Sequence, residues 1–280
     1  MSRQHQAEVI SNTPLEASGH FVMILECPEV AGAARPGQFV HVRCSPYHDP
    51  LLRRPLSVAG VSDDQTRLSL LVREVGKGTA ILARLAEGAK VDILGPLGNG
   101  YTLRVDKDDR EFVLVAGGYG AAPIHFAARC LGQIRGRLEQ PRLSVFLGAA
   151  SADRLAFADG LSSTADDLHL VTEDGSVGDR GLVTDPLTAY LETAEVTRVM
   201  ACGPTGMMAA VARICERQEI PCEVSLENWM GCGVGACLGC VVPVRPEGEA
   251  EGGARGQRYV RVCADGPVFD AHAIVWEAMP

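Results

Sequence analysis

Short runs of apolar residues, separated by glycine and proline, fill the first third of the chain. Alternating apolar and polar positions are typical of strands that bury one face, and the glycine and proline residues between them indicate turns. Many short strands joined by turns predict an antiparallel barrel, with one short helix at 79–88. The predicted strands are residues 20–27, 38–44, 55–61, 67–75 and 90–96.

The pattern changes after the charged segment 106–110. A continuous apolar run then breaks into glycines and continues as a helical pattern. Further apolar strands at 142–149, 167–174 and 196–204 alternate with short, weakly marked helices. Alternating strands and helices predict a doubly wound parallel sheet. The fold class is therefore a multidomain β plus α/β protein. We divide it into a barrel at 1–105, an α/β domain at 106–222 and a small cysteine-rich domain at 223–280.

The last segment is built around four cysteines. Cys232, Cys237 and Cys240 have a C-x4-C-x2-C spacing, and Cys263 follows after 22 intervening residues. This spacing is typical of the ligands of a plant-type [2Fe–2S] cluster. The interleaved glycines let one loop bend around the cluster and present N–H groups to sulfur. The alternatives are a zinc knuckle, whose ligands usually form two C-x2-C pairs, or packed free cysteines.

Length, composition and charge narrow the class of protein. A chain of 280 residues suits two domains and a small appendage. A net charge of -9 with no basic patch argues against a nucleic-acid partner. No apolar run reaches the roughly 18 residues of a membrane span, and the N-terminus lacks a signal-peptide pattern, so we expect a cytoplasmic protein without membrane contact. The six remaining cysteines are expected to be core residues rather than disulfides.

Two motifs in the barrel can hold phosphate. Arg54 precedes Ser57 at the start of a strand, where a guanidinium can bind a pyrophosphate. Gly78 and Thr79 follow in a glycine-rich turn that opens a helix, where free N–H groups attract anions. The alternative for the first motif is an exposed basic pair, formed by Arg53 and Arg54.

The α/β segment carries two glycine-rich turns, AGGYGAAP and ACGPTGMM, each after a strand. Ligands of open α/β sheets bind at these strand ends, so both turns indicate a dinucleotide site. Asp153 favours NAD(H) over NADP(H) by repelling a 2′-phosphate, whereas Arg154 and Arg180 weaken this preference. Tyr119 either stacks on a ring or merely packs against its neighbours, and packing is the favoured interpretation.

The order of motifs resembles the ferredoxin-NADP reductase superfamily: R-x-x-S, G-x-G-T, GPLGNG, GG-x-G-x-AP and ACGP. The chain departs from the usual pattern at Ala116 and Tyr119. The resemblance implies that FAD and NAD(H) are bound, and it implies a role for 15 residues. Those expected to contact FAD are Arg54, Pro55, Leu56, Ser57, Leu71, Val72, Arg73, Gly78 and Thr79, and those expected to contact NAD(H) are Gly117, Gly118, Gly120, Cys202, Gly203 and Pro204.

The cluster motif and the later VCADGPVFDA resemble the electron-transfer subunits of type B dihydroorotate dehydrogenases over essentially the whole chain. The resemblance implies an oxidoreductase component of pyrimidine biosynthesis. In that family, electrons pass between NAD(H), FAD, the [2Fe–2S] cluster and FMN in a catalytic partner that oxidises dihydroorotate. Two copies of each chain form a heterotetramer.

A flavin can exchange two electrons with a nicotinamide and one with a cluster, so no acid–base catalytic residue is required. The six histidines considered are therefore interpreted as surface or packing residues: His20, His41, His48, His125, His169 and His272. Trp229, Met230 and Leu238 could form an apolar docking patch, or Trp229 could instead cover the flavin or pack in the core. The alternatives are a subunit of another NAD(P)H-dependent ferredoxin oxidoreductase, sulfide dehydrogenase or hydrogenase, and a redox sensor without turnover.

Overall fold

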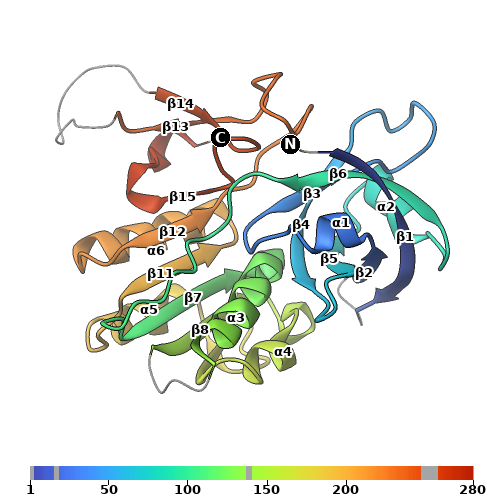
Figure 1. Cartoon of the computed structure of the whole chain (residues 1–280). Helices are drawn as coiled ribbons and strands as arrows, with labels where there is room; N and C mark the ends of the chain where they lie inside the picture. The colour runs from blue at the N-terminus through green and yellow to red at the C-terminus, as the bar shows by residue number, and fades with distance from the viewer. Residues whose placement is uncertain (1–2, 16–18, 137–140, 247–257, 280) are drawn as a thin grey trace.

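A barrel and an α/β sheet lie side by side in the computed structural model, and the C-terminal segment lies above the sheet (Figure 1). The structure describes residues 3–15, 19–136, 141–246 and 258–279. No helix in these ranges is both long and apolar enough to cross a membrane. The glycine-rich turns of the α/β sheet lie at its edge next to the barrel.

Six strands of the described residues close into an antiparallel barrel in the order β1-β2-β5-β4-β3-β6. Side chains that point inward, such as Val40, Leu70 and Ile93, are fully buried. Five of the strands were predicted, whereas the first was not. The strands are β1 (Arg3–Pro14), β2 (His20–Glu26), β3 (Phe39–Val42), β4 (Arg54–Val61), β5 (Arg67–Arg73) and β6 (Lys90–Leu97), with the short helices α1 (Pro28–Ala31) and α2 (Lys77–Ala83).

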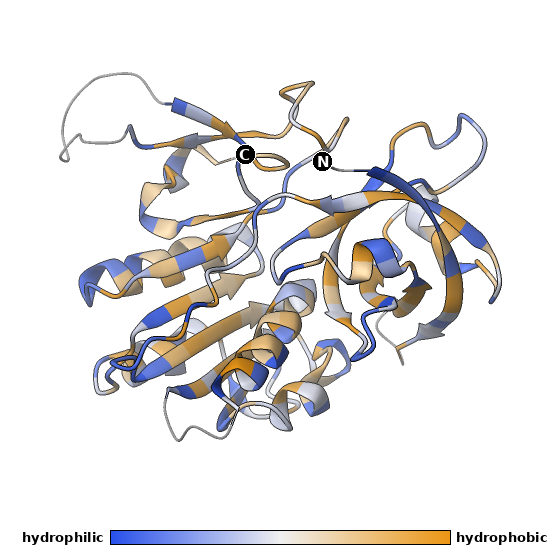
Figure 2. Cartoon of the chain, in the orientation of Figure 1, coloured by the Kyte–Doolittle hydropathy of each residue, from blue (hydrophilic) through white to orange (hydrophobic). Residues whose placement is uncertain are grey.

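The second part is a seven-stranded sheet in the order β10-β9-β8-β7-β11-β12-β15. Its strands are parallel except β15, which runs antiparallel to β12. Figure 2 shows apolar residues along its central strands, as expected for strands covered on both faces. The strands are β7 (Glu111–Gly117), β8 (Arg142–Ala149), β9 (Asp167–Thr172), β10 (Asp179–Arg180), β11 (Arg198–Cys202), β12 (Cys222–Ser225) and β15 (Val268–Asp270).

Helices cover both faces of this sheet. On one face, α3 (Ala121–Arg135) and α4 (Ala158–Ser162) contribute to one apolar core. On the other face, α5 (Thr184–Leu191) and α6 (Thr205–Arg217) contribute to a second core. This arrangement confirms the predicted doubly wound α/β architecture.

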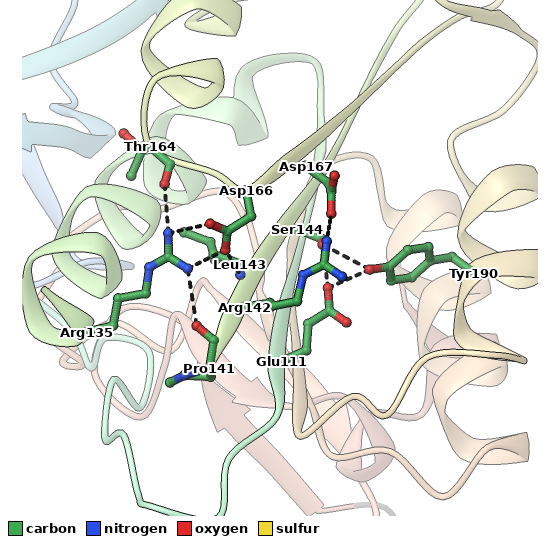
Figure 3. A network of polar contacts seen from close by, with 10 residues as sticks. All are labelled: Glu111, Arg135, Pro141, Arg142, Leu143, Ser144, Thr164, Asp166, Asp167 and Tyr190. Carbon is green, nitrogen blue, oxygen red and sulfur yellow. Dashed lines mark hydrogen bonds and ion pairs between the residues drawn. The ribbon is translucent and has the colours of Figure 1, made fainter. Parts of the chain in front are cut away.

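A polar network joins the strand ends on the edge opposite the glycine-rich turns (Figure 3). The buried Glu111 carboxylate accepts a hydrogen bond from the Tyr190 hydroxyl at 2.6 Å and another from Ser144. Ion pairs link Arg142 to Asp167 and Arg135 to Asp166 nearby. Side chains therefore occupy the amino ends of these strands. Ligands of open α/β sheets bind at the carboxyl ends, where the glycine-rich turns lie.

The C-terminal segment leaves the sheet after β12 and returns to it as β15. Between them lie the cysteine loop and a two-stranded ribbon, β13 (Val241–Val244) with β14 (Arg258–Arg261). The domain boundaries predicted at 105/106 and 222/223 stay predictions. The pairing of β12 with β15 shows that the segment after residue 222 is continuous with the sheet.

Candidate redox site

The four predicted cluster cysteines converge, and backbone N–H groups surround their sulfurs. Cys232 Sγ accepts hydrogen bonds from three amides of its own loop, those of Val234 at 3.4 Å, Ala236 at 3.3 Å and Cys237 at 3.4 Å. Such a ring of amides stabilises negative charge on sulfur. Burial alone would raise the pKa of the Cys232 thiol, but these amides and the Cys237 thiol lower it to about 6.

The other two cysteines form a second pair. The amide of Cys263 donates to Cys240 Sγ at 3.5 Å, and the amide of Gly235 donates to Cys263 Sγ at 3.1 Å. Burial and the neighbouring Cys240 thiol raise the pKa of Cys263 to about 12. A crowded thiol of this kind is deprotonated when a metal binds it. The donor set, two thiol pairs with amides directed at sulfur, fits a [2Fe–2S] cluster.

Two glycines allow the loop to take this course. Gly233 and Gly235 have φ angles of +72° and +78°, in the left-handed region that favours glycine. A Cβ atom at Gly235 would lie 2.8 Å from the Cβ of Ala264, so the loop and the segment around Cys263 approach closely there. The loop geometry therefore depends on residues without side chains.

An ion pair closes the loop from its other side. The Arg261 guanidinium donates to Asp265 Oδ1 at 2.7 Å and Oδ2 at 2.9 Å, and to the carbonyl of Gly235 at 3.1 Å. This charged partner lowers the pKa of Asp265 to about 2. Arg261 thus ties the glycine-rich loop to the turn that carries the fourth cysteine.

The predicted FAD residues gather on β4, β5 and the start of α2. A Cβ atom at Gly78 would lie 3.0 Å from Arg54 Nε, so the two predicted phosphate contacts are neighbours. The Thr79 hydroxyl is used within the chain: it accepts the amides of Val75 at 2.9 Å and Gly76 at 3.2 Å. The Thr79 hydroxyl is therefore engaged within the chain, and its predicted contact with the pyrophosphate stays a prediction. The arrangement fits a pyrophosphate group.

The remaining predicted FAD residues lie on the strands next to Arg54. Pro55, Leu56 and Ser57 continue β4, while Leu71, Val72 and Arg73 end β5. Arg53 differs from Arg54, because its guanidinium pairs with the Asp92 carboxylate of β6 at 2.9 Å. The alternative of an exposed basic pair therefore does not describe Arg53, and the individual FAD contacts stay predictions.

A cavity of about 510 Å³ opens at the carboxyl ends of the sheet strands, next to the barrel. Four of the predicted nucleotide residues line it: Gly117, Gly118, Gly203 and Pro204. From the barrel side, His20 and Arg73 contribute to its wall. A cleft with glycine turns on one wall and a predicted flavin residue on the other fits a dinucleotide whose nicotinamide approaches FAD.

Gly120 and Cys202 do not line the cavity but lie behind the residues that do. A Cβ atom at Gly120 would lie 2.1 Å from the carbonyl oxygen of Cys202, so only glycine allows the turn to rest on β11. The Cys202 thiol is buried and donates to the carbonyl of Ser225 at 3.5 Å. Their predicted direct contacts with NAD(H) stay predictions.

Sequence reasoning missed several cavity residues. Tyr119 lines the cavity with 41% of its surface exposed, and the choice between stacking on a bound ring and packing stays a prediction. Glu227 also lines it, and its side chain is exposed. Its position two residues after the buried strand β12 was the only sequence signal for Glu227. Arg154 lines the cavity together with Glu173, whereas Asp153 does not.

The GPLGNG turn contacts the C-terminal segment. The amide of Asn99 donates to the carbonyl of Gly266 at 2.6 Å, and its side chain donates to the carbonyl of Asp265 at 3.0 Å. A Cβ atom at Gly98 would lie 2.4 Å from Pro267 Cδ. The turn therefore fastens the segment that follows Cys263 to the end of the barrel.

His41 is buried between the barrel and the cysteine loop, with 0% of its surface exposed. Of the two predicted roles, surface or packing, the structure shows that His41 is a packing residue. Burial, then the charge of Arg53, lower the pKa of His41 to about 4, against the opposite effect of the Cys232 backbone. The imidazole is therefore neutral at physiological pH.

Two family models match the chain. Residues 227–275 match the iron-sulfur cluster binding domain of dihydroorotate dehydrogenase B, and residues 16–101 match an oxidoreductase FAD-binding domain. Together they cover the cysteine site and the barrel described above. The redox groups implied by the sequence, FAD and an iron–sulfur cluster, therefore agree with the matched models.

Curated relatives align along nearly the whole chain. The dihydroorotate dehydrogenase B (NAD(+)) electron transfer subunit of Desulforamulus reducens is 36% identical over 277 residues, 99% of this chain and 100% of the relative. The subunit of the same name from Geobacillus kaustophilus is 39% identical over 241 residues, 86% of this chain and 87% of the relative.

Solved structures give the same architecture. A chain of an NADH-dependent reduced ferredoxin-NADP oxidoreductase superposes with a TM-score of 0.81 and 29% identity, covering 97% of this chain and 90% of that one. The ferredoxin reductase of carbazole 1,9a-dioxygenase superposes with a TM-score of 0.65 at 18% identity, over 79% of this chain and 67% of that one. The second likeness concerns the fold alone.

Proposed function

Since this chain belongs to the family of dihydroorotate dehydrogenase B electron transfer subunits, we propose that it passes electrons between NAD(H) and a partner flavoenzyme through FAD and a [2Fe–2S] cluster. The observation that carries the proposal is the placement of two sites against one barrel. The dinucleotide cavity meets the barrel at His20 and Arg73, and the cysteine loop meets it at His41. Predicted flavin residues of β4 and β5 belong to the same barrel.

The roles of the chain's own residues follow from this placement. The glycine turns after β7 and β11 leave room for the dinucleotide at the edge of the sheet. Arg54 and Gly78 hold the pyrophosphate of FAD, and the four cysteines hold the cluster. Bound FAD supplies the conversion between two-electron and one-electron transfer. The protein therefore needs to position three redox groups and exclude water, without an acid–base residue.

The partner we propose is an FMN-containing catalytic subunit that oxidises dihydroorotate to orotate, with two copies of each chain in the complex. Support comes from the names of the relatives and from the surface beside the cysteines. Three large apolar side chains are exposed there, Trp229 at 90%, Val234 at 48% and Leu238 at 60%. We call these three residues the cluster-loop patch. Apolar side chains exposed together are typical of docking surfaces.

The test is anaerobic affinity purification of the chain from its native cell, with analysis of co-purifying proteins and their flavins. We expect a second chain in equal amount that contains FMN, and reduction of NAD+ by dihydroorotate in the complex. A complex of 2:2 stoichiometry by native mass spectrometry supports the heterotetramer. Recovery of the chain with FAD and iron but with another redox partner would contradict the dihydroorotate assignment.

A second candidate is a subunit of an NAD(P)H-dependent ferredoxin oxidoreductase. It is favoured by the superposition on the NADH-dependent reduced ferredoxin-NADP oxidoreductase chain, at a TM-score of 0.81. Both candidates require FAD, the cluster and a nicotinamide. Rapid reduction of ferredoxin by the purified complex, without orotate-linked activity, would favour this second candidate.

A further inference from the structure

His41 lies where the barrel touches the cysteine loop. On β3 it is paired with Pro55 of β4, a predicted flavin contact. Its imidazole faces the loop: a Cβ atom at Gly233 would lie 2.5 Å from His41 Nδ1 and 3.1 Å from its Cγ. Gly233 directly follows the cluster ligand Cys232. A single side chain therefore reaches from a flavin-binding strand to the backbone beside a cluster ligand.

The imidazole is an unusual choice for this position if its role is only to fill space. Both ring nitrogens are buried and lie near the backbone of Cys232 and Arg53, but neither forms a hydrogen bond of normal geometry with any of the described residues. Leaving a buried polar group unpaired destabilises a protein, so an apolar side chain would be more favourable here in the protein without cofactors. The neighbouring Arg53 does not offset this cost, because its guanidinium is bound to Asp92 and to backbone carbonyls.

A partly buried imidazole shows the contrast. His125 Nδ1 lies 2.8 Å from the carbonyl oxygen of Ala59, and its ring stacks on Phe157 at a centroid distance of 4.5 Å. That histidine has a partner for its polar atom and a packing partner for its ring. His41 instead directs unpartnered nitrogens into the junction of two cofactor sites.

We propose that His41 is a positioning residue that seats the cluster loop against the flavin-binding strands and thereby sets the rate of electron passage between FAD and the cluster. The inference rests on the proposed function, since it assumes that both groups are bound. A neutral imidazole has one N–H donor and one acceptor nitrogen, so it can bond the backbone or a sulfur of the loaded site. Gly233 is the matching half of the contact, because any larger residue would push the loop away from the ring.

The experiment uses the full chain, purified anaerobically with FAD and iron, and compares His41→Leu with His41→Asn. Leucine keeps bulk without polar atoms, and asparagine keeps a polar atom near the position of Nδ1. With NADH in stopped flow, we expect flavin reduction by His41→Leu within about twofold of the parent, because the dinucleotide cavity lies elsewhere. We expect its cluster reduction to be slower by about tenfold or more, the usual effect of losing a residue that orients metal ligands.

Spectroscopy separates positioning from general destabilisation. The electron paramagnetic resonance spectrum of the reduced cluster and its midpoint potential should change in His41→Leu at unchanged iron content. His41→Asn should restore both towards the parent values. Parent-like spectra and parent-like cluster reduction in His41→Leu would overturn the inference. A parent chain that shows no cluster signal would instead refute the proposed function.

Gly233→Ala tests the same contact from the loop and keeps the inference falsifiable if His41→Leu does not fold. Its matched control is Gly88→Ala, since Gly88 has a φ angle of +81° but nothing within 4 Å of its Cβ position. Both substitutions carry the backbone strain, and only the first meets His41. We expect Gly233→Ala to slow cluster reduction while Gly88→Ala does not. Equal behaviour of the two variants would contradict the proposed contact.

Discussion

The dinucleotide edge of the sheet and the cysteine loop build their sites in opposite ways. Every residue of β7 is buried, and the glycine turn that follows it rests on β11 through a backbone contact. Packing of apolar strands thus shapes this edge before any ligand binds. The sheet shows how a core can preform a binding site.

The cysteine segment shares the core on one face of the sheet through buried residues such as Val242 and Val262. The cysteine loop itself exposes several apolar side chains to solvent, and the described strands next to it, β13 and β14, have four residues each. Its shape depends on amides directed at sulfur, on glycines in the left-handed region and on the Arg261–Asp265 pair. The comparison teaches that one site is preformed by the fold, whereas the other is completed by the group it binds.

The largest effect is expected from loss of a cluster ligand. Cys237→Ser removes one of four thiolates, so we expect loss of the iron signal and of electron exit. Hydride transfer from NADH to FAD, followed with an artificial acceptor of flavin electrons, should be partly retained because the sheet is intact. Normal reduction of an acceptor that depends on the cluster would contradict the assignment of Cys237 as a ligand.

A change in the sheet core should act on the whole protein instead. Leu114→Ala truncates a fully buried side chain on β7, and we expect it to lower the free energy of unfolding by about 2–5 kcal/mol. Urea denaturation followed by circular dichroism measures this change. If the variant lost iron selectively while its sheet kept the parent stability, the contrast between the two regions would not hold.

The exposed face of the cysteine segment should matter for association rather than for folding. Trp229→Ala removes a side chain that is 90% exposed, so unfolding should be unchanged while partner binding weakens by about 2 kcal/mol, the usual effect at an interface hot spot. Titration with the catalytic partner measures the affinity. Ile134→Ala, which truncates an apolar residue of α3 that is 49% exposed, is the control and should bind normally.

A small effect on stability is expected for the ion pair beside the loop. The pKa of Asp265 is lowered, so its contribution is present above about pH 4 and is lost as pH falls towards 2. Because both side chains are more than a third exposed, Asp265→Asn should cost less than about 1 kcal/mol at pH 7.

Iron release is the sharper measurement for this variant. We expect Asp265→Asn to lose iron to a chelator faster than the parent, because Arg261 no longer ties Gly235 to the turn after Cys263. The control Asp167→Asn breaks an exposed pair with Arg142 in the sheet and should release iron at the parent rate. Equal release rates from both variants would show that the Arg261 contact does not hold the loop.

Local patterns were sufficient for much of this fold. Apolar runs bounded by glycine or proline located five barrel strands and the central strands of the sheet, because each buries side chains with a regular period. The cysteine spacing predicted the cluster site for a similar reason, since three of the ligands lie in one loop. The strand β1 was missed because only Ala7 and Val9 of its twelve residues are fully buried.

Contacts between distant segments could not be read in this way. Nothing near His41 in the sequence indicates that Gly233 will cover it, and nothing near Asn99 indicates the turn after Cys263. Glu227 and His20 reach one cavity from different parts of the fold. These positions follow from how the barrel, the sheet and the last segment dock, which single-sequence periodicity does not encode.

Because β12 pairs with β15, the cluster segment leaves the sheet and returns to it at one place, and it could be replaced as a unit. Ser225 lies opposite Val268 in an antiparallel register, so the two ends of the intervening loop emerge side by side from the same edge of the sheet. A short hairpin turn could replace everything between them, β13 and β14 included, without breaking a strand of the seven-stranded sheet. Such a replacement would leave a flavin reductase without a cluster. Inserting other loops at the same junction offers a way to change the acceptor of its electrons.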